Sequence, residues 1–277
     1  MHRVFVLRAY GDFIIFLQAL LKSDFKKDYH VVASKHLHPI FLAVSKFVDT
    51  SAISIEFVDF GIQKTLLSFF TNRYFFSIGA VKELFKIKNW LRNNPNKLGI
   101  DYLEQDKRLT SFNLLIGQKF RPILKKENVY ETYNRFFQIS QNHEINTGTN
   151  PINNIVIFPD SRLPAKNIPN DVLKNIATIL KQKDKQVQVA YFKQAPENEN
   201  HHSSTILYDN FDDLLALIQN SEMIIGADSL PIHLANLLNK PHYIFYPKGF
   251  TQLFVTPWAK QQQYFGNFEQ YQFSFID

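Results

Sequence analysis

The amino-acid sequence predicts an α/β protein made of two successive series of strands and helices. Short runs rich in β-branched and aromatic residues alternate with longer apolar segments of helical spacing. This alternation starts at residue 3 and restarts at residue 154. Between the two series lies a polar stretch, residues 141–154, which holds Gly148, Pro151 and five asparagines. We therefore expect two domains, residues 1–147 and residues 151–277.

The individual elements follow from the same patterns. In the first series they predict strands 3–9, 29–34, 53–57, 98–103 and 112–116 and helices 12–22, 36–47, 81–92 and 128–139. In the second series they predict strands 154–158, 186–191, 222–226 and 242–246 and helices 170–181, 211–219 and 230–238. Strands that are joined by helices pair in parallel, so each series should form a doubly wound, Rossmann-like sheet.

Composition narrows the class of protein further. The chain has 45% hydrophobic residues, including 27 phenylalanines, so it can bury a substantial core. It has no cysteine, which fits a reducing compartment. The first apolar run is far too short for a signal peptide, and no stretch approaches the roughly 20 apolar residues that a membrane span needs. We expect a soluble, cytoplasmic protein.

Residues 223–246 carry the strongest functional pattern. An apolar strand ends at Gly226, a short loop carries Asp228, Ser229 stands where a helix N-cap belongs, and Pro231 follows in the first turn. A loop at the carboxyl end of a parallel strand, followed by a helix start, is suited to bind a diphosphate. On spacing alone a structural interpretation is equally open: Ser229 caps the helix, Asp228 bonds within the loop, and His233 packs in the core or lies on the surface.

This segment, GADSLPIHLANLLNKPHYIFY, resembles the C-terminal signature of the ADP-heptose:lipopolysaccharide heptosyltransferase family, glycosyltransferase family 9. That signature is Gly-x-Asp-Thr/Ser-Gly-x-x-His-Leu-Ala, followed by Gly/Asn-Lys-Pro. The positions in register are Gly226, Asp228, Ser229, His233, Leu234, Ala235, Lys240 and Pro241. The resemblance implies the GT-B fold, in which an N-terminal acceptor domain and a C-terminal nucleotide-sugar domain flank a cleft.

Two further stretches fall in the order that the family requires. Residues 8–12, Arg-Ala-Tyr-Gly-Asp, resemble the family's opening Arg-x-x-x-Gly-Asp, which implies that Asp12 is the catalytic base. A carboxylate within hydrogen-bond reach can take the proton of an attacking acceptor hydroxyl. From the residues alone, Asp12 is also a good helix N-cap. Residues 158–169 resemble the family's Ser-x-x-Lys-x-Trp-Pro loop, which implies that Lys166 neutralises the leaving diphosphate; otherwise this is a polar surface loop.

Together the resemblance implies one base, Asp12, and a set of donor-binding residues. These are Ser161, Arg162, Lys166, Glu197, Asp228, Ser229, Leu230 and His233. Glu197 is included because it follows strand 186–191, where the family has a carboxylate for the ribose hydroxyls. Two positions depart from the family: its Gly after Asp-Thr is Leu230 here, and its Trp before Pro is Ile168. These departures favour an alternative, a nucleotide-sugar-binding homologue without catalysis.

The expected reaction is inverting transfer of a heptose-like sugar from a nucleotide-diphosphate sugar to a cell-envelope glycolipid or polysaccharide, as in lipopolysaccharide biosynthesis. No metal signature is present, and the resemblance implies that neither a metal nor a cofactor is needed. No nucleic-acid-binding motif is recognisable, so we expect no nucleic-acid partner.

The basic excess lies in the first half of the chain. Residues 1–150 hold 21 Lys and Arg against 13 Asp and Glu, whereas residues 151–277 hold 10 against 12. Residues 60–92 interleave bases with aromatics, which suits an anionic acceptor or peripheral contact with the inner membrane. The alternative is that the aromatics belong to the core and the bases are solvated.

Overall fold

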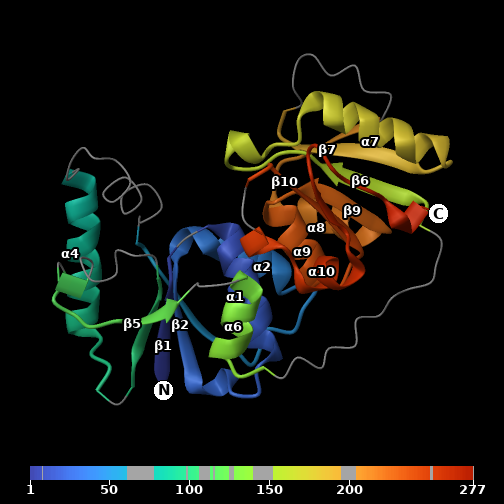
Figure 1. Ribbon diagram of the computed structural model, residues 1–277. Coiled ribbons are helices and arrows are strands. Elements are labelled where there is room, and N and C mark those ends of the chain that lie inside the picture. The colour runs from blue at the N-terminus through green and yellow to red at the C-terminus, as the bar shows by residue number, and fades with distance from the viewer. Residues whose placement is uncertain are drawn as a thin grey trace. The chain divides into compact units, whose positions relative to one another are not determined.

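The computed structural model describes residues 1–7, 9–60, 78–97, 99–105, 113, 114, 116–124, 128–139, 152–194, 204–249 and 252–276. The chain divides into two compact units, Met1–Gln141 and Asn142–Asp277, each built on its own sheet (Figure 1). Every strand pairing within the two sheets is parallel. The predicted α/β class with two parallel sheets is therefore confirmed.

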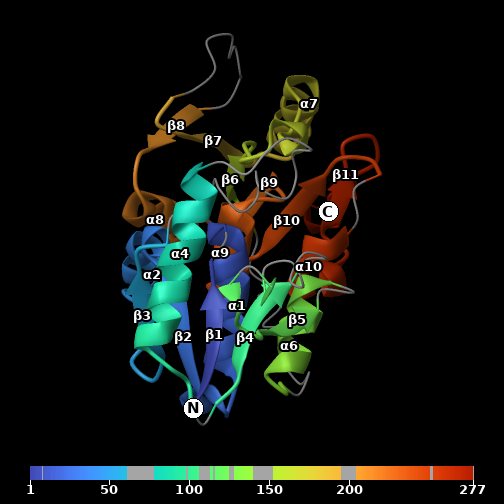
Figure 2. The same ribbon diagram turned by 90° about the vertical axis from the view of Figure 1, so that its left-hand side faces the viewer.

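The N-terminal unit contains a five-stranded sheet of order β3-β2-β1-β4-β5 (Figure 2). Its strands are β1 (His2–Val6), β2 (Tyr29–Ser34), β3 (Ser54–Val58), β4 (Asp101–Gln105) and β5 (Arg121–Leu124). Its helices are α1 (Tyr10–Lys22), α2 (His38–Val44), α4 (Ile78–Asn93) and α6 (Val129–Phe136), with short 3₁₀ turns η1 (Lys26–Asp28) and η2 (Lys35–Leu37).

Alternation along the strands divides the core of this unit between the two faces of the sheet. Phe5 and Val32 pack against the apolar side of α4, which contributes Leu84, Ile87 and Leu91. Helices α1, α2 and α6 cover the face of the sheet opposite α4 (Figure 1). Helix α1 is buried continuously from Phe13 to Leu20, so its apolar run can pack on the sheet and on α6 at once.

The C-terminal unit contains a six-stranded sheet of order β11-β10-β9-β6-β7-β8. Its strands are β6 (Asn154–Phe158), β7 (Gln186–Phe192), β8 (Ser204–Tyr208), β9 (Met223–Ala227), β10 (His242–Tyr246) and β11 (Phe265–Asn267). Its helices are α7 (Asn170–Gln182), α8 (Phe211–Asn220), α9 (Leu230–Leu237) and α10 (Pro257–Gln262), with 3₁₀ turns η3 (Pro164–Lys166), η4 (Gln252–Phe254) and η5 (Ser274–Ile276).

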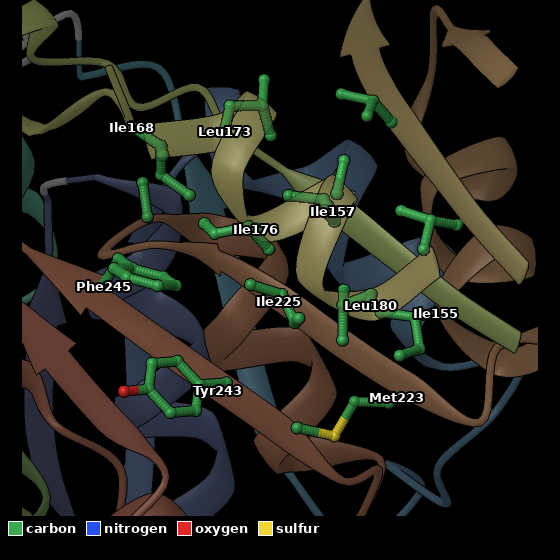
Figure 3. Packing of buried hydrophobic residues seen from close by; sticks show 14 of the residues in the cluster. Ile155, Ile157, Ile168, Leu173, Ile176, Leu180, Met223, Ile225, Tyr243 and Phe245 are labelled. Carbon is green, nitrogen blue, oxygen red and sulfur yellow. The ribbon is translucent and has the colours of Figure 1, made fainter. Parts of the chain in front are cut away.

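An extended apolar cluster of this unit lies between the sheet and α7 (Figure 3). Helix α7 contributes Leu173, Ile176 and Leu180 at helical spacing, and β9 contributes Met223 and Ile225, which alternate toward this face. Helices α8, α9 and α10 lie on the other face (Figure 1). Because both faces are covered, β9 is buried along its whole length, as the unbroken apolar run of its sequence predicts.

Both strand orders contain a point at which the direction of winding reverses. In the N-terminal sheet this point lies between β1 and β4, and in the C-terminal sheet it lies between β6 and β9. At such a point the two connections leave the sheet in opposite directions, which opens a crevice at the carboxyl ends of the strands where ligands bind. In the C-terminal unit, the loops that follow β6 and β9 carry the predicted donor-binding residues Lys166 and Asp228.

Edge strands account for most of the differences from the sequence-based expectations. The strand predicted over 112–116 is wrong, because Asn113, Leu114 and Ile116 are helical. Strands β5, β8 and β11 were not predicted. All three lie at the outer edge of their sheets, where a strand needs little apolar alternation, and an edge also tolerates Pro122 in β5. Helix α2 is shorter than predicted at both ends, since residues 35–37 form a separate 3₁₀ turn and residues 45–47 form a turn.

Candidate functional site

Asp228 follows the carboxyl end of β9, directly before α9. Gly226 makes the close approach of the helix possible: a Cβ there would lie 3.1 Å from the carbonyl oxygen of Phe158 and 3.2 Å from Ile232 of α9. The backbone N–H of Asp228 donates to the carbonyl of Phe245 at 2.9 Å, which holds the loop against β10. The short strand, loop and helix thus place a carboxylate at the edge of the sheet.

The Asp228 carboxylate is the centre of a buried charge cluster. Its Oδ2 lies 2.5 Å from Nζ of Lys166, and its Oδ1 lies 3.6 Å from Nε2 of His233. The side chains of Lys166 and Asp228 are only 14% and 12% exposed. Burial alone raises the pKa of Asp228, but the hydrogen bond and charge of His233 and the Lys166 ammonium outweigh it and hold the pKa below its ordinary value. Asp228 is therefore an anion at neutral pH.

The loop after β6 is folded so that it presents Lys166 to Asp228. The side-chain oxygen of Asn167 accepts the N–H of Ser161 at 2.8 Å, and the next residue, Ile168, is buried in the α7 cluster. The Ser161 hydroxyl lies 3.4 Å from the Asp228 carbonyl and donates to it. The loops that follow β6 and β9 therefore meet at the point where the winding of the sheet reverses.

Ser229 occupies the N-cap position of α9 but does not cap it. Its backbone is extended, with φ −154° and ψ 177°, and its hydroxyl makes no capping bond. The oxygen is buried and has no hydrogen-bond partner among the residues that the structure describes. The expectation that the Ser229 hydroxyl caps the helix is wrong. A buried hydroxyl without a partner costs roughly 1–3 kcal/mol, so this position favours a ligand that can bond to it.

Leu230 is the first residue of α9, and Pro231 follows it in the first turn. The half-exposed Leu230 side chain stands where the family has Gly, and its backbone is not among those with positive φ. A side chain is thus accommodated here without backbone strain. The second departure, Ile168, is 3% exposed and packs in the core.

Of the remaining predicted residues, the structure describes Arg162 and Asp12 but not Glu197. Arg162 is exposed and is not among the contacts of Asp228. Asp12 is half-buried in the first turn of α1, which begins at Tyr10 and has Ala9 at its N-cap position. The interpretation of Asp12 as an N-cap is therefore wrong; it lies near the carboxyl end of β1, the central strand of its sheet. Glu197 lies outside the described residues, as does Arg8.

Two contact residues were missed by the sequence reasoning. Phe254 places its ring 5.2 Å from Nζ of Lys166 and 6.2 Å from the ring of His233, so it covers the cluster. Asn167 orders the loop of Lys166. No local pattern marks Phe254 among the many phenylalanines, whereas Asn167 directly follows Lys166 in the loop that we singled out.

Within the described parts of the chain, no three His, Asp or Glu side chains gather as a metal site would require. Metal independence stays a prediction. No described helix is both long and apolar enough to cross a membrane.

The sequence matches the model of glycosyltransferase family 9 (heptosyltransferase) over residues 125–275, more than half of the chain. The chain belongs to glycosyltransferase family 9. The predictions of this family and of a glycosyltransferase are thereby confirmed. A comparison of this family 9 enzyme with curated proteins finds no match.

Solved structures of the same family share the fold of this family 9 enzyme. Escherichia coli heptosyltransferase WaaC, solved with ADP-2-deoxy-2-fluoro heptose, is 14% identical with a TM-score of 0.57, over 90% of each chain. A family 9 glycosyltransferase from Veillonella parvula is 14% identical with a TM-score of 0.59, over 96% of this chain and 86% of the other. E. coli ADP-heptose lps heptosyltransferase II is 14% identical with a TM-score of 0.56, over 96% and 90%. The predicted GT-B fold is confirmed.

Proposed function

We propose that this family 9 enzyme transfers a heptose-like sugar, with inversion, from a nucleotide-diphosphate sugar to a cell-envelope glycolipid or polysaccharide at the cytoplasmic face of the membrane. The observation that carries the proposal is the Asp228 cluster: a largely buried carboxylate with a lysine and a histidine, before the start of α9 and beside a serine hydroxyl that has no partner among the described residues. A nucleotide sugar fits the relatives, because one of them was solved with an ADP-heptose analogue.

The diphosphate would bind at the first turn of α9. The N–H groups of a helix start have no partners within the helix and lie at the positive end of its dipole, which favours an anion. The Ser229 hydroxyl can donate to a phosphate oxygen and so gain the bond that it lacks in the free protein. Lys166 can turn from Asp228 to the phosphate that leaves, where its charge stabilises the departing anion most.

Asp228 would keep Lys166 in place while the site is empty. When the ammonium moves to the diphosphate, His233 at 3.6 Å remains as a donor to the carboxylate. Asp228 can then accept a hydroxyl of the donor sugar, because one of its oxygens has been released. Ser161 links the two loops. We further propose Arg162 as a ligand of the phosphates and Glu197 as a ligand of the ribose.

We propose Asp12 as the base, in an N-terminal acceptor domain of residues 1–147 that complements a donor domain of residues 151–277. The attacking hydroxyl must lose its proton as it bonds to the anomeric carbon, and a carboxylate supplies this at neutral pH. Attack on the face opposite the diphosphate inverts the anomeric centre.

Asp12→Ala tests this role. We expect the rate of transfer to fall by about 10²–10⁴-fold, the usual contribution of a general base, while calorimetry shows donor binding unchanged. Asp24→Ala, in the polar turn after α1, is the matched control. Full transfer activity in a folded Asp12→Ala protein would remove the assigned base.

Leu230 supports a second candidate, a homologue that binds nucleotide sugars without turnover, because its side chain stands where the family has glycine. Calorimetry with a panel of ADP-, GDP- and UDP-sugars, paired with a donor-hydrolysis and transfer assay, separates the two. Binding without any turnover would support the second candidate.

Contact with an anionic membrane is part of the first proposal. The outer side of α4 exposes Phe85 with Lys82, Lys86 and Arg92, whereas its inner side is buried. Each such base near an anionic surface contributes about 1 kcal/mol. Sedimentation with anionic liposomes should therefore be salt-sensitive, and equal sedimentation with neutral liposomes would count against membrane contact.

A further inference from the structure

A cavity lies in the C-terminal unit, away from the Asp228 cluster. It is an open groove of about 1130 Å³ between α7 and the segment that follows α10. One wall is a single side of α7, where Asp171, Asn175 and Ile179 are spaced four residues apart. The opposite wall is the segment from Phe268 to Gln272. None of the residues that line it belongs to the donor site described above.

The second wall is held in a fixed shape. The side-chain oxygen of Asn267 accepts the N–H groups of Glu269 and Gln270 at 2.9 Å, and the backbones of Asn267 and Gln270 exchange two further bonds of 3.1 Å. Gly266 allows the turn to lie close to the sheet, because a Cβ there would come within 2.8 Å of Cβ of Tyr271. This wall is therefore preorganised.

The two walls are joined by one hydrogen bond. Nδ2 of Asn175 on α7 donates to the hydroxyl of Tyr271 at 2.6 Å. Asn175 is exposed and Tyr271 is half-exposed, so both side chains also face solvent in the groove. Behind them Phe245 packs edge-on against the Tyr271 ring, and Phe273 packs against it at a tilt of 48°, so both fix its orientation.

The chemistry of the lining selects a class of ligand. Amides and aromatic rings dominate it: Asn175, Gln263, Gln270 and Gln272 with Phe265, Phe268 and Tyr271. The charges are one lysine and two carboxylates, which does not suit a polyanion such as nucleic acid or a phosphorylated lipid head group. An amide both donates and accepts, as a sugar hydroxyl does, and an aromatic ring offers an apolar face to the C–H face of a sugar ring. The groove also exceeds the size of most small-ligand pockets and is open, as an extended ligand requires.

We propose that this groove binds a stretch of neutral sugar residues in the acceptor polysaccharide. The identity of that polysaccharide as the acceptor rests on the proposed function, whereas sugar binding by the groove does not. A second binding site for the same polysaccharide molecule raises the local concentration of the acceptor at the enzyme, without any contact at the reacting hydroxyl. Loss of the groove should therefore raise the KM for a long acceptor and leave kcat unchanged.

Saturation-transfer NMR on the full chain, with maltohexaose and with dephosphorylated lipopolysaccharide core oligosaccharide as probes, tests the proposal. We expect binding of at least one probe, weakened at least fivefold by Asn175→Ala and by Gln270→Ala. Tyr271→Phe, which keeps the ring, should weaken it less. The matched control is Gln182→Ala, an exposed amide on α7 outside the groove.

Failure of both probes to bind at millimolar concentration, or wild-type binding by both groove variants, would overturn the proposal. Calorimetry with the donor on the same variants should match the wild type, because the groove and the Asp228 cluster share no residue. Suppose that the wild-type enzyme turns over no nucleotide sugar while the groove variants lose sugar binding. In that case the proposed sugar transfer is refuted, whereas the assignment of the groove as a sugar-binding site is supported.

Discussion

Both units of this family 9 enzyme contain, among their described residues, a carboxylate that lies largely buried against a cation, and the two pairs are built differently. In the N-terminal unit, the Asp101 carboxylate accepts hydrogen bonds from Nε and Nη2 of Arg3, both at 2.8 Å. Its two oxygens also accept from Asn96 at 2.8 Å and from Gln118 at 2.9 Å. In the C-terminal unit, Asp228 has a lysine at 2.5 Å and a histidine at 3.6 Å.

The difference separates a structural pair from an exchangeable one. Arg3 is a planar fork whose remaining nitrogen, Nη1, donates to the carbonyl of Asn94 at 2.6 Å, and its guanidinium stacks over Trp90. This pair lies at the amino ends of β1 and β4, and each Asp101 oxygen already accepts two hydrogen bonds from within the unit. Lys166 carries its charge on a flexible stem, and its cluster lies at the carboxyl ends of the strands beside the unsatisfied Ser229. Only the second arrangement can rearrange around a substrate.

The largest effect should come from breaking the structural pair. Asp101→Ala leaves the Arg3 guanidinium buried without its partner, which we expect to cost about 3–5 kcal/mol of stability. Amide hydrogen exchange in β1 and β4 measures this loss, and transfer activity per folded molecule should not change. Lys86→Ala, which removes an exposed lysine from its ion pair with Glu83 in the same unit, is the control and should change exchange little. Wild-type protection in Asp101→Ala would refute the structural assignment.

Breaking the exchangeable pair should affect the reaction instead. We expect Lys166→Ala to lower kcat by about 10²–10³-fold, because the charge that stabilises the leaving diphosphate is lost. Steady-state kinetics at saturating donor checks this. Lys174→Ala on α7, an exposed lysine of the same unit, should keep wild-type kcat. If Lys166→Ala keeps most of its kcat as well, Lys166 serves only to hold Asp228.

Acid should destabilise the C-terminal unit more than the N-terminal unit. Burial lowers the pKa of His242 from 6.5 to about 4. Its Nδ1 donates to the carbonyl of Lys240, and its Nε2 bonds to Thr256, so the folded state holds the neutral ring. In the unfolded chain the His242 ring binds a proton below pH 6.5. Protonation of His242 therefore leaves the free energy of unfolding unchanged above pH 6.5 and lowers it by as much as about 3 kcal/mol as the pH drops to 4.

Hydrogen exchange of the two units between pH 7 and pH 4.5 measures this difference. None of the described histidines of the N-terminal unit is buried. His242→Gln should flatten the pH dependence of the C-terminal unit. An equal acid response of both units in the wild type would argue against this assignment.

The smallest effect is also the most specific one. Ser229→Ala removes a buried hydroxyl that has no hydrogen-bond partner among the described residues, so the free protein should lose no stability and gain about 1 kcal/mol, the lower end of the cost of an unpaired hydroxyl. The donor should bind about fivefold more weakly by calorimetry, because a bond to the diphosphate is lost. Ser221→Ala is the opposite case: its hydroxyl donates to the carbonyl of Leu217 at 2.5 Å, so stability should fall while donor affinity stays. Unchanged donor affinity in Ser229→Ala would separate this hydroxyl from the donor site.

The sequence by itself determined the α/β class, the two series and the loops that carry the site. Strands such as β9 are buried on both faces and read as unbroken apolar runs, so they are recognisable without any neighbour. Edge strands are half-exposed and carry no such run, so the sequence pattern does not predict β5, β8 or β11. The loop after β6 and the loop after β9 were both singled out, yet no pattern in either loop specifies which atoms of the two meet.

Only the tertiary structure decided which side chains meet. Lys166 and Asp228 are 62 positions apart, and Arg3 and Asp101 are 98 apart. Such pairs depend on which strands are neighbours, and strand order is set by the packing of whole helices on the sheet and not by local propensity. The same holds for Ser229, whose sequence context favours a cap: the backbone of the loop is extended, and the buried hydroxyl has no partner within the part of the chain that the structure describes.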